Sequence, residues 1–198
     1  YGVIAPYDCP KSERILREAC AKLMKEPLQG QFGPVNALAL MATGNPEYLP
    51  KVRSYMRSIQ VSDSPDVVGM IAWPWGYKGI ALCEYYLLTG DKSVLPKIQK
   101  HVVNIAKRQS MYGTFGHGGC ERTYDGKRHG SIPPYGAINS AGLTCNISII
   151  LGKKCGVRHP EIEPAVERAA GFFSYYAGKG SIPYGEHMPW KVHGANGK

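Results

Sequence analysis

The chain has 198 residues, a formal net charge of +9 and 43% hydrophobic residues, which suits one domain with a sizeable core. No apolar run reaches the roughly 18 residues that a membrane-spanning helix needs, and the basic residues are scattered instead of alternating with aromatic ones. The sequence therefore argues against a membrane span and against a nucleic-acid partner. The six cysteines form no CxxC pair, which excludes zinc-ribbon and thioredoxin sites.

Apolar residues at helical spacing predict an all-α fold with very little strand. Glycine or proline separates nearly every pair of predicted helices. In chain order, the predicted helices are 11–26, 33–43, 47–60, 76–89, 94–110, 136–151 and 161–177.

The predicted helices repeat in pairs. Residues 37–59 align with residues 83–105 at an offset of 46. Residues 145–173 give a third copy that has a six-residue insertion between its glycine and its proline. A glycine is expected just past each first helix, and a proline in the first turn of each second helix. These positions are Gly44, Gly90 and Gly152, and Pro50, Pro96 and Pro164. The first helix of each pair is apolar nearly all round and the second is amphipathic, which predicts an inner helix covered by an outer one.

This pattern resembles the α/α-toroid superfamily, which includes terpenoid cyclases, protein prenyltransferase β subunits and complement-like thioester domains. The resemblance is carried by an inner helix ending in Thr-Gly, an outer helix starting with Leu-Pro-Lys, and the glycine-rich linkers GTFGHGG (113–119) and GSIPYGEH (180–187). It implies a ring of inner helices inside a ring of outer helices. The chain is also similar to an uncharacterised group of large bacterial toroid proteins, for which the resemblance supplies no activity.

Residues 1–198 hold about three and a half hairpins, so we expect a single toroid segment that is part of a larger protein. The rest of the polypeptide or another copy would then complete the ring. The functional motifs of the named families do not carry over. Asp63-Ser-Pro-Asp66 is not the acidic motif of squalene-type cyclases, and Gly119-Cys120-Glu121-Arg122 lacks the glutamine of the thioester motif. The zinc ligands of prenyltransferases have no matching positions.

Two glycine-rich linkers carry candidate acid/base groups in comparable places. His117 and Glu121 lie in or beside the first linker, and Glu186 and His187 lie in the second. Because imidazole titrates near neutral pH, these groups would suit proton transfer if the linkers cluster at one end of the ring. The alternative is structural, with the histidines capping helix ends or tying linkers together.

Aromatic residues fall near the predicted starts of inner helices and in the linkers, where they would line a ligand pocket at the mouth of the ring. Flat rings suit sugars or isoprenoid chains, although core packing is the preferred explanation for at least half of these residues. The candidate ligand-binding residues are Trp73, Trp75, Tyr77, Tyr112, Tyr135, Tyr184 and Trp190.

A metal site is a further candidate in the stretch from 111 to 136, where imidazole, thiolate and carboxylate groups lie within thirteen residues. The four residues are His117, Cys120, Asp125 and His129. Their spacing fits no familiar metal motif, so a hydrogen-bonded loop is the preferred interpretation and we predict no metal ligands.

Two functions of different classes follow. The first is a toroid domain whose glycine-rich linkers form a pocket for an organic ligand, a glycan or an isoprenoid, with catalysis by the acid/base groups as an extension. The second is a non-catalytic binding or scaffold domain of a larger extracellular protein, secreted or periplasmic. The sequence identifies neither the reaction nor a cofactor.

Overall fold

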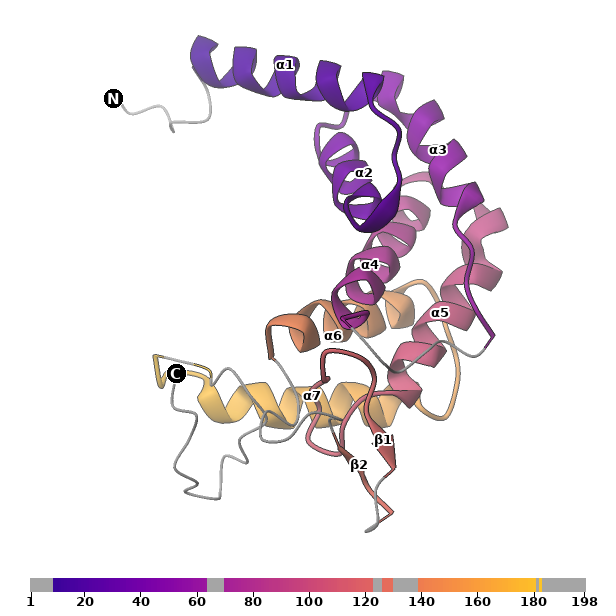
Figure 1. Ribbon diagram of the computed structural model, residues 1–198, viewed down its shortest axis with the longest axis vertical. Helices are drawn as coiled ribbons and strands as arrows, with labels where there is room; N and C mark the ends of the chain where they lie inside the picture. Colours follow the sequence, from indigo (N-terminus) through magenta and orange to yellow (C-terminus); the bar gives the residue numbers. More distant parts are fainter. Residues whose placement is uncertain (1–8, 64–69, 123–125, 130–138, 181, 183–198) are drawn as a thin grey trace. The chain divides into compact units, whose positions relative to one another are not determined.

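The computed structural model describes residues 9–63, 70–122, 126–129, 139–180 and 182 (Figure 1). Within these ranges the regular structure consists of seven α-helices, three short 3-10 helices and one pair of two-residue strands. The prediction of an all-α fold is therefore confirmed. The chain divides into two compact units, Tyr1–Ser58 and Ile59–Lys198.

The first unit contains the helices α1 (Pro10–Lys25), η1 (Gly30–Phe32), α2 (Gly33–Ala42), η2 (Pro46–Tyr48) and α3 (Leu49–Ser58). The helix α2 packs against both α1 and α3. The Lys51 ammonium of α3 donates a hydrogen bond to the Met24 carbonyl at 2.8 Å, and so satisfies a carbonyl that the end of α1 leaves free. The buried core side chains include Cys20, Leu40, Val52 and Met56.

The second unit contains α4 (Ala72–Thr89), η3 (Lys92–Val94), α5 (Leu95–Lys107), α6 (Asn139–Lys154) and α7 (Ile162–Tyr176). Between α5 and α6, the strands β1 (Glu121–Arg122) and β2 (Arg128–His129) pair antiparallel. The helices α4 and α6 pack most extensively on one another, α5 packs on both of them, and α7 packs on α5 and α6 (Figure 1). The amphipathic helices α5 and α7 thus pack on the apolar helices α4 and α6, although part of the apolar surface of α4 and α6 stays exposed.

Small residues bring α4 and α6 into close contact. A Cβ atom added to Gly76 would lie 2.7 Å from the backbone carbonyl carbon of Thr144, and one added to Gly79 would lie 1.8 Å from Ser148 Oγ. Cys145 Sγ donates to the Ala72 carbonyl at 3.2 Å across the same contact. The two backbones can approach this closely only because α4 has no side chain at these two positions.

The turns after α2 and α4 share the same kind of hydrogen bonding, which supports the repeat. In each turn a threonine hydroxyl donates to a carbonyl of the last helical turn and accepts from the N–H two residues later. The distances are 2.7 Å (Thr43 Oγ1 to Leu40 O) and 3.1 Å (Asn45 N to Thr43 Oγ1), then 2.7 Å (Thr89 Oγ1 to Tyr85 O) and 3.2 Å (Asp91 N to Thr89 Oγ1). Gly44 and Gly90 complete the turns at φ +67° and +68°, where glycine is favoured.

The third copy departs from the predicted pattern. The prediction that Gly152 ends its first helix is wrong, because α6 continues to Lys154 and the left-handed glycine is Gly156, at φ +91°. Gly152 instead lies inside α6, where a Cβ atom would be 2.6 Å from Val102 Cγ1. This glycine therefore serves the approach of α6 to α5 and not a turn.

The start of α4 also differs from the prediction, since the helix begins at Ala72 and not at residue 76. Pro74 lies in the first turn, where its missing N–H breaks no helical hydrogen bond. Trp73 and Trp75 consequently belong to the helix instead of preceding it. The Ala72 N–H, at the helix start, donates to the His117 carbonyl at 2.8 Å, so the first glycine-rich linker satisfies one of the free donors of α4.

His101 is a buried polar residue of α5 that holds the start of α4. Its Nε2 lies 2.9 Å from the Trp75 carbonyl, so the neutral ring donates to this oxygen. Burial lowers the pKa of His101 to about 4, and the positive charge of Lys78 acts in the same direction. His101 is therefore neutral at pH 7 and has a structural role.

We expect Gly76→Ala to lower the free energy of unfolding by about 2 to 3 kcal/mol, because the new methyl group meets the backbone of Thr144. Gly171→Ala on α7 is the matched control, since no atom lies within 4 Å of its added Cβ, and it should stabilise the protein by up to about 1 kcal/mol. Urea unfolding of both variants checks this expectation. Equal effects of the two substitutions would contradict the close contact of α4 with α6.

The lowered pKa of His101 predicts that acid destabilises the protein. The unfolded chain, whose histidine has a pKa of about 6.5, binds more protons than the folded chain as the pH falls from about 6.5 to about 4. The neutral ring therefore contributes its full stabilisation above about pH 6.5, the pKa of histidine in the unfolded chain. This stabilisation is lost as the pH falls toward 4, and the loss is on the order of 3 kcal/mol.

His101→Gln keeps a donor for the Trp75 carbonyl but removes the titration, so its stability should fall less steeply over this pH range. Urea unfolding of both proteins at about pH 7 and about pH 4.5 measures the difference. The same loss of stability in both proteins would show that His101 does not cause it.

Candidate functional site

The stretch that follows α5 is a buried, hydrogen-bonded segment and not a loose connection. Gln109, Ser110, Thr114 and Phe115 are fully buried. The Ser110 hydroxyl accepts from the Thr114 N–H at 3.2 Å, and the Ser110 N–H donates to the Thr114 carbonyl at 2.8 Å. Gly113 lies in this turn at φ +91°, and its added Cβ would be 2.4 Å from the Arg168 carbonyl. Glycine is therefore required here for both conformation and space.

The side-chain amide of Gln109 joins this segment to α6 and α7. Its Nε2 donates to Asn146 Oδ1 and to the Ala165 carbonyl, both at 2.9 Å. Its Oε1 accepts from Arg168 Nε at 2.8 Å. Asn146 in turn donates to the Gly113 carbonyl at 2.8 Å. Both hydrogens of the Gln109 amide nitrogen and its oxygen are thus used, as a buried amide requires.

The β1–β2 hairpin brings Arg128 over the ends of two helices. Glu121 pairs with His129 and Arg122 with Arg128, and the Met111 N–H donates to the Arg128 carbonyl at 2.8 Å. The Arg128 guanidinium donates to the Lys107 carbonyl at the end of α5 and to Glu161 Oε2, 3.1 Å away, beside the start of α7. Because two different nitrogens of its guanidinium donate hydrogen bonds, the Arg128 side chain has little freedom to move.

A polar pocket of about 480 Å³ lies beside the hairpin. Three cationic side chains, two carboxylates and a thiol line it: Lys107, Arg108, Arg128, Glu121, Glu161 and Cys120. Arg108 Nη1 lies 3.8 Å from Glu121 Oε1, and both side chains keep part of their surface exposed. Charged groups of both signs at one pocket suit a ligand that offers several polar atoms.

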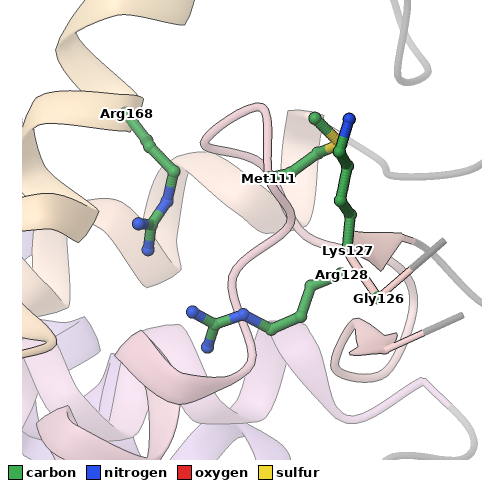
Figure 2. A pocket seen from close by; sticks show the side chains of 5 residues that line it. All are labelled: Met111, Gly126, Lys127, Arg128 and Arg168. Carbon is green, nitrogen blue, oxygen red and sulfur yellow. The ribbon is translucent and has the colours of Figure 1, made fainter.

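A smaller pocket of about 220 Å³ adjoins the same hairpin and is lined by Met111, Gly126, Lys127, Arg128 and Arg168. Figure 2 shows the guanidinium groups of Arg128 and Arg168 turned toward one another, although Arg128 comes from β2 and Arg168 from α7. Burial lowers the pKa of Arg168, and the charge of Arg128 lowers it further. The two like charges therefore face each other in a partly buried place.

Of the four residues predicted as acid/base groups, the structure describes His117 and Glu121. Glu121 lines the larger pocket, whereas His117 lines neither pocket and packs its ring on Trp73 at a centroid distance of 5.2 Å. The His117 Nδ1 atom is buried and has no hydrogen-bond partner among the described residues. Glu186 and His187 lie outside the described residues, so their convergence with this pair stays a prediction.

The aromatic candidates are dispersed. Trp75 is buried in the core, while Trp73, Tyr77 and Tyr112 are half-buried. The ring of Tyr112 contacts that of His129 edge-on at 5.9 Å. None of these four lines either of the two pockets beside the hairpin. Tyr135, Tyr184 and Trp190 lie outside the described residues.

The metal hypothesis receives no support from the part of the chain that the structure describes, where no cluster of three histidine, cysteine or acidic side chains suits a metal ion. Asp125, one of the four residues considered, lies outside that part. Across the described ranges, none of the helices has the length and apolar character to cross a membrane.

Sequence reasoning missed Gln109, Arg128 and Arg168, which build the site. Arg128 stands in the stretch singled out for its histidines and acids, but a single arginine carries no pattern. Gln109 and Arg168 are 59 positions apart, and no local spacing links a glutamine at a helix end to an arginine of a later helix. Gln109 stands between Arg108 and Ser110 in the sequence, so no local pattern marks it as a buried residue.

Comparison with known families gives one match, a family model described as "Domain of unknown function (DUF6288)" that covers residues 12–198. The chain belongs to this family. No curated protein and no solved structure matches it.

Replacing Gln109 with Met should lower the free energy of unfolding by about 3 kcal/mol, because Asn146 Oδ1, the Ala165 carbonyl and Arg168 Nε would lose a buried partner. Gln99→Met, at an exposed position of α5, is the matched control and should change it by less than about 0.5 kcal/mol. Guanidinium unfolding monitored by circular dichroism compares the two. Similar stabilities would mean that the amide network contributes little.

Proposed function

We propose that this member of the DUF6288 family is a ligand-binding domain that takes a polar organic ligand of the glycan kind beside the β1–β2 hairpin. The observation that carries the proposal is the lining of the larger pocket, with three cationic and two anionic side chains around about 480 Å³. Sugars and related ligands bind through several hydroxyl or acidic groups, each of which needs a polar partner. An isoprenoid chain would need an apolar lining, so the charged lining favours the glycan over the isoprenoid.

We further propose that the hairpins form part of an α/α-toroid, with α2, α4 and α6 as inner helices and α1, α3, α5 and α7 as outer helices. The hydrogen bonds and left-handed glycines that the turns after α2 and α4 share support a structural repeat. An apolar stripe on α6, formed by Leu143, Ile147 and Ile150, is exposed, as expected for an inner helix with room for a further neighbour. A crystal structure in which α2, α4 and α6 do not line one ring would contradict the toroid.

The ligand proposal is tested by thermal denaturation and calorimetry with neutral oligosaccharides, acidic oligosaccharides and isoprenoid diphosphates. We expect a member of the saccharide panel to raise Tm and to bind saturably. Glu121→Gln should weaken this binding about tenfold, since the amide has no charge and offers one acceptor oxygen in place of two. Glu163→Gln is the matched control, because Glu163 pairs with Lys153 on the surface and lines neither pocket.

A shift with isoprenoids alone would overturn the preference for a polar ligand. The absence of any shift would favour the alternative of a scaffold domain within a larger extracellular protein. A catalytic role for His117, Glu121, Glu186 and His187 stays a separate prediction.

A further inference from the structure

Two cysteines of the second unit meet where the end of α6 lies against α4. Cys83 lies inside α4, and Cys155 comes directly after Lys154, the last residue of α6. The two positions are 72 residues apart in sequence, yet Cys155 Sγ donates to the Cys83 carbonyl at 3.7 Å. The two thiols are also hydrogen-bonded to one another, and neither forms a disulfide. The fold therefore brings two thiols into contact.

The two thiols differ in access and in acidity. Cys83 is completely buried, whereas Cys155 keeps 8% of its surface exposed. The hydrogen bond from Cys83 lowers the pKa of Cys155, although burial and the charge of Glu84 act in the opposite direction. The same hydrogen bond and burial raise the pKa of Cys83. Because the thiolate is the reactive form of cysteine, Cys155 is the thiol of this pair that meets an oxidant first.

Cys145, on α6, provides an internal comparison. It is completely buried, its Sγ donates to the Ala72 carbonyl at 3.2 Å, and burial raises the pKa of its thiol. A buried thiol that keeps its proton is inert toward oxidants. Cys145 is therefore a structural cysteine, against which the reactivity of Cys155 can be measured.

We propose that Cys155 and Cys83 form a redox-active dithiol, which hydrogen peroxide converts into a disulfide that locks α4 to the end of α6. In the first step the Cys155 thiolate attacks one peroxide oxygen, the O–O bond breaks, and the departing hydroxide takes a proton and becomes water. Cys155 is then a sulfenic acid. In the second step the Cys83 sulfur attacks Cys155 Sγ, the S–O bond breaks, and the departing hydroxide takes the Cys83 proton. The two sulfur atoms together lose two electrons, which reduce one peroxide to two waters.

The disulfide has a structural effect that can be measured. It closes a loop between positions 72 apart, which restricts the unfolded chain and so favours the folded second unit. Cys155 lies in a turn beside Gly156, at φ +91°, so the two sulfur atoms can approach through movement of a turn and not of a helix. A dithiol reductant reverses the change. Neither cysteine lines the two pockets beside the hairpin, so the site is independent of the proposed ligand.

The experiment treats the full chain carrying Cys9→Ser with a small molar excess of hydrogen peroxide under native conditions. Cys9 is the most exposed of the six cysteines, and serine is a favoured residue at its N-cap position. The remaining thiols are then alkylated, and the peptides are identified by mass spectrometry. We expect one cross-link, between Cys83 and Cys155, which dithiothreitol removes. The oxidised protein should also unfold at a higher urea concentration than the reduced protein.

Single substitutions in this background separate the two roles. Cys83→Ala should abolish the cross-link and leave a sulfenic acid at Cys155 that dimedone labels, whereas Cys155→Ser should abolish both products. Cys145→Ser is the matched control, because serine keeps a donor for the Ala72 carbonyl, and it should leave the yield of the cross-link unchanged. Cys155 lies outside the helices, so Cys155→Ser decides the question if Cys83→Ala does not fold.

Three results would overturn the proposal. The first is the absence of a cross-link between Cys83 and Cys155 in the oxidised protein. The second is oxidation of Cys145 as fast as that of Cys155, which would mean that the contact between the two thiols confers no reactivity. The third is the same urea midpoint for the oxidised and the reduced protein, which would show that the disulfide does not lock α4 to α6.

Discussion

The second unit depends on one buried amide. Gln109 lies where α5 has ended, and its side chain donates to α6 and α7 while it accepts from Arg168. A buried amide imposes a strict constraint, because an unmet hydrogen bond in the core costs more than a met one contributes. The three helices must therefore arrive at mutually compatible positions. The same amide also positions the site beside the hairpin, because it orients Arg168. Arg128 is hydrogen-bonded to the end of α5 and to Glu161 beside the start of α7.

The side chains of this unit that suit ligand binding are charged, and packed helices and the β1–β2 hairpin hold them in place. The glycine-rich stretch after α5 supplies close approaches and turns, and its Ser110 and Thr114 hydroxyls are hydrogen-bonded within the fold. The charged side chains that line the two pockets come largely from the hairpin and from α7. Binding residues carried by a short hairpin over packed helices combine exposure with a fixed position, which is the usual arrangement for recognition.

The features predicted correctly from the sequence are those with local causes. The helices follow from periodicity, and the turns after α2 and α4 follow from a threonine, a glycine and an acidic or amide residue in succession. Gly152 was misassigned because a glycine that ends a helix and a glycine that admits a neighbouring helix look the same in sequence. The Gln109 network and the facing arginines could not be predicted, since partners 37 and 59 positions apart meet only after the helices have packed.

The contact between α4 and α6 has a mechanical consequence. Gly76 leaves room for the backbone and side chain of Thr144, and Gly79 leaves room for the side chain of Ser148. A slide of one helix along the other would move Thr144 and Ser148 away from the glycine positions and against side chains of α4, so translation is opposed in both directions. At a helix contact made by large apolar side chains, the side chains can repack and allow several relative positions of the two helices. A contact made at glycine positions allows only one relative position. We therefore expect α4 and α6 to move together as one rigid element of this unit.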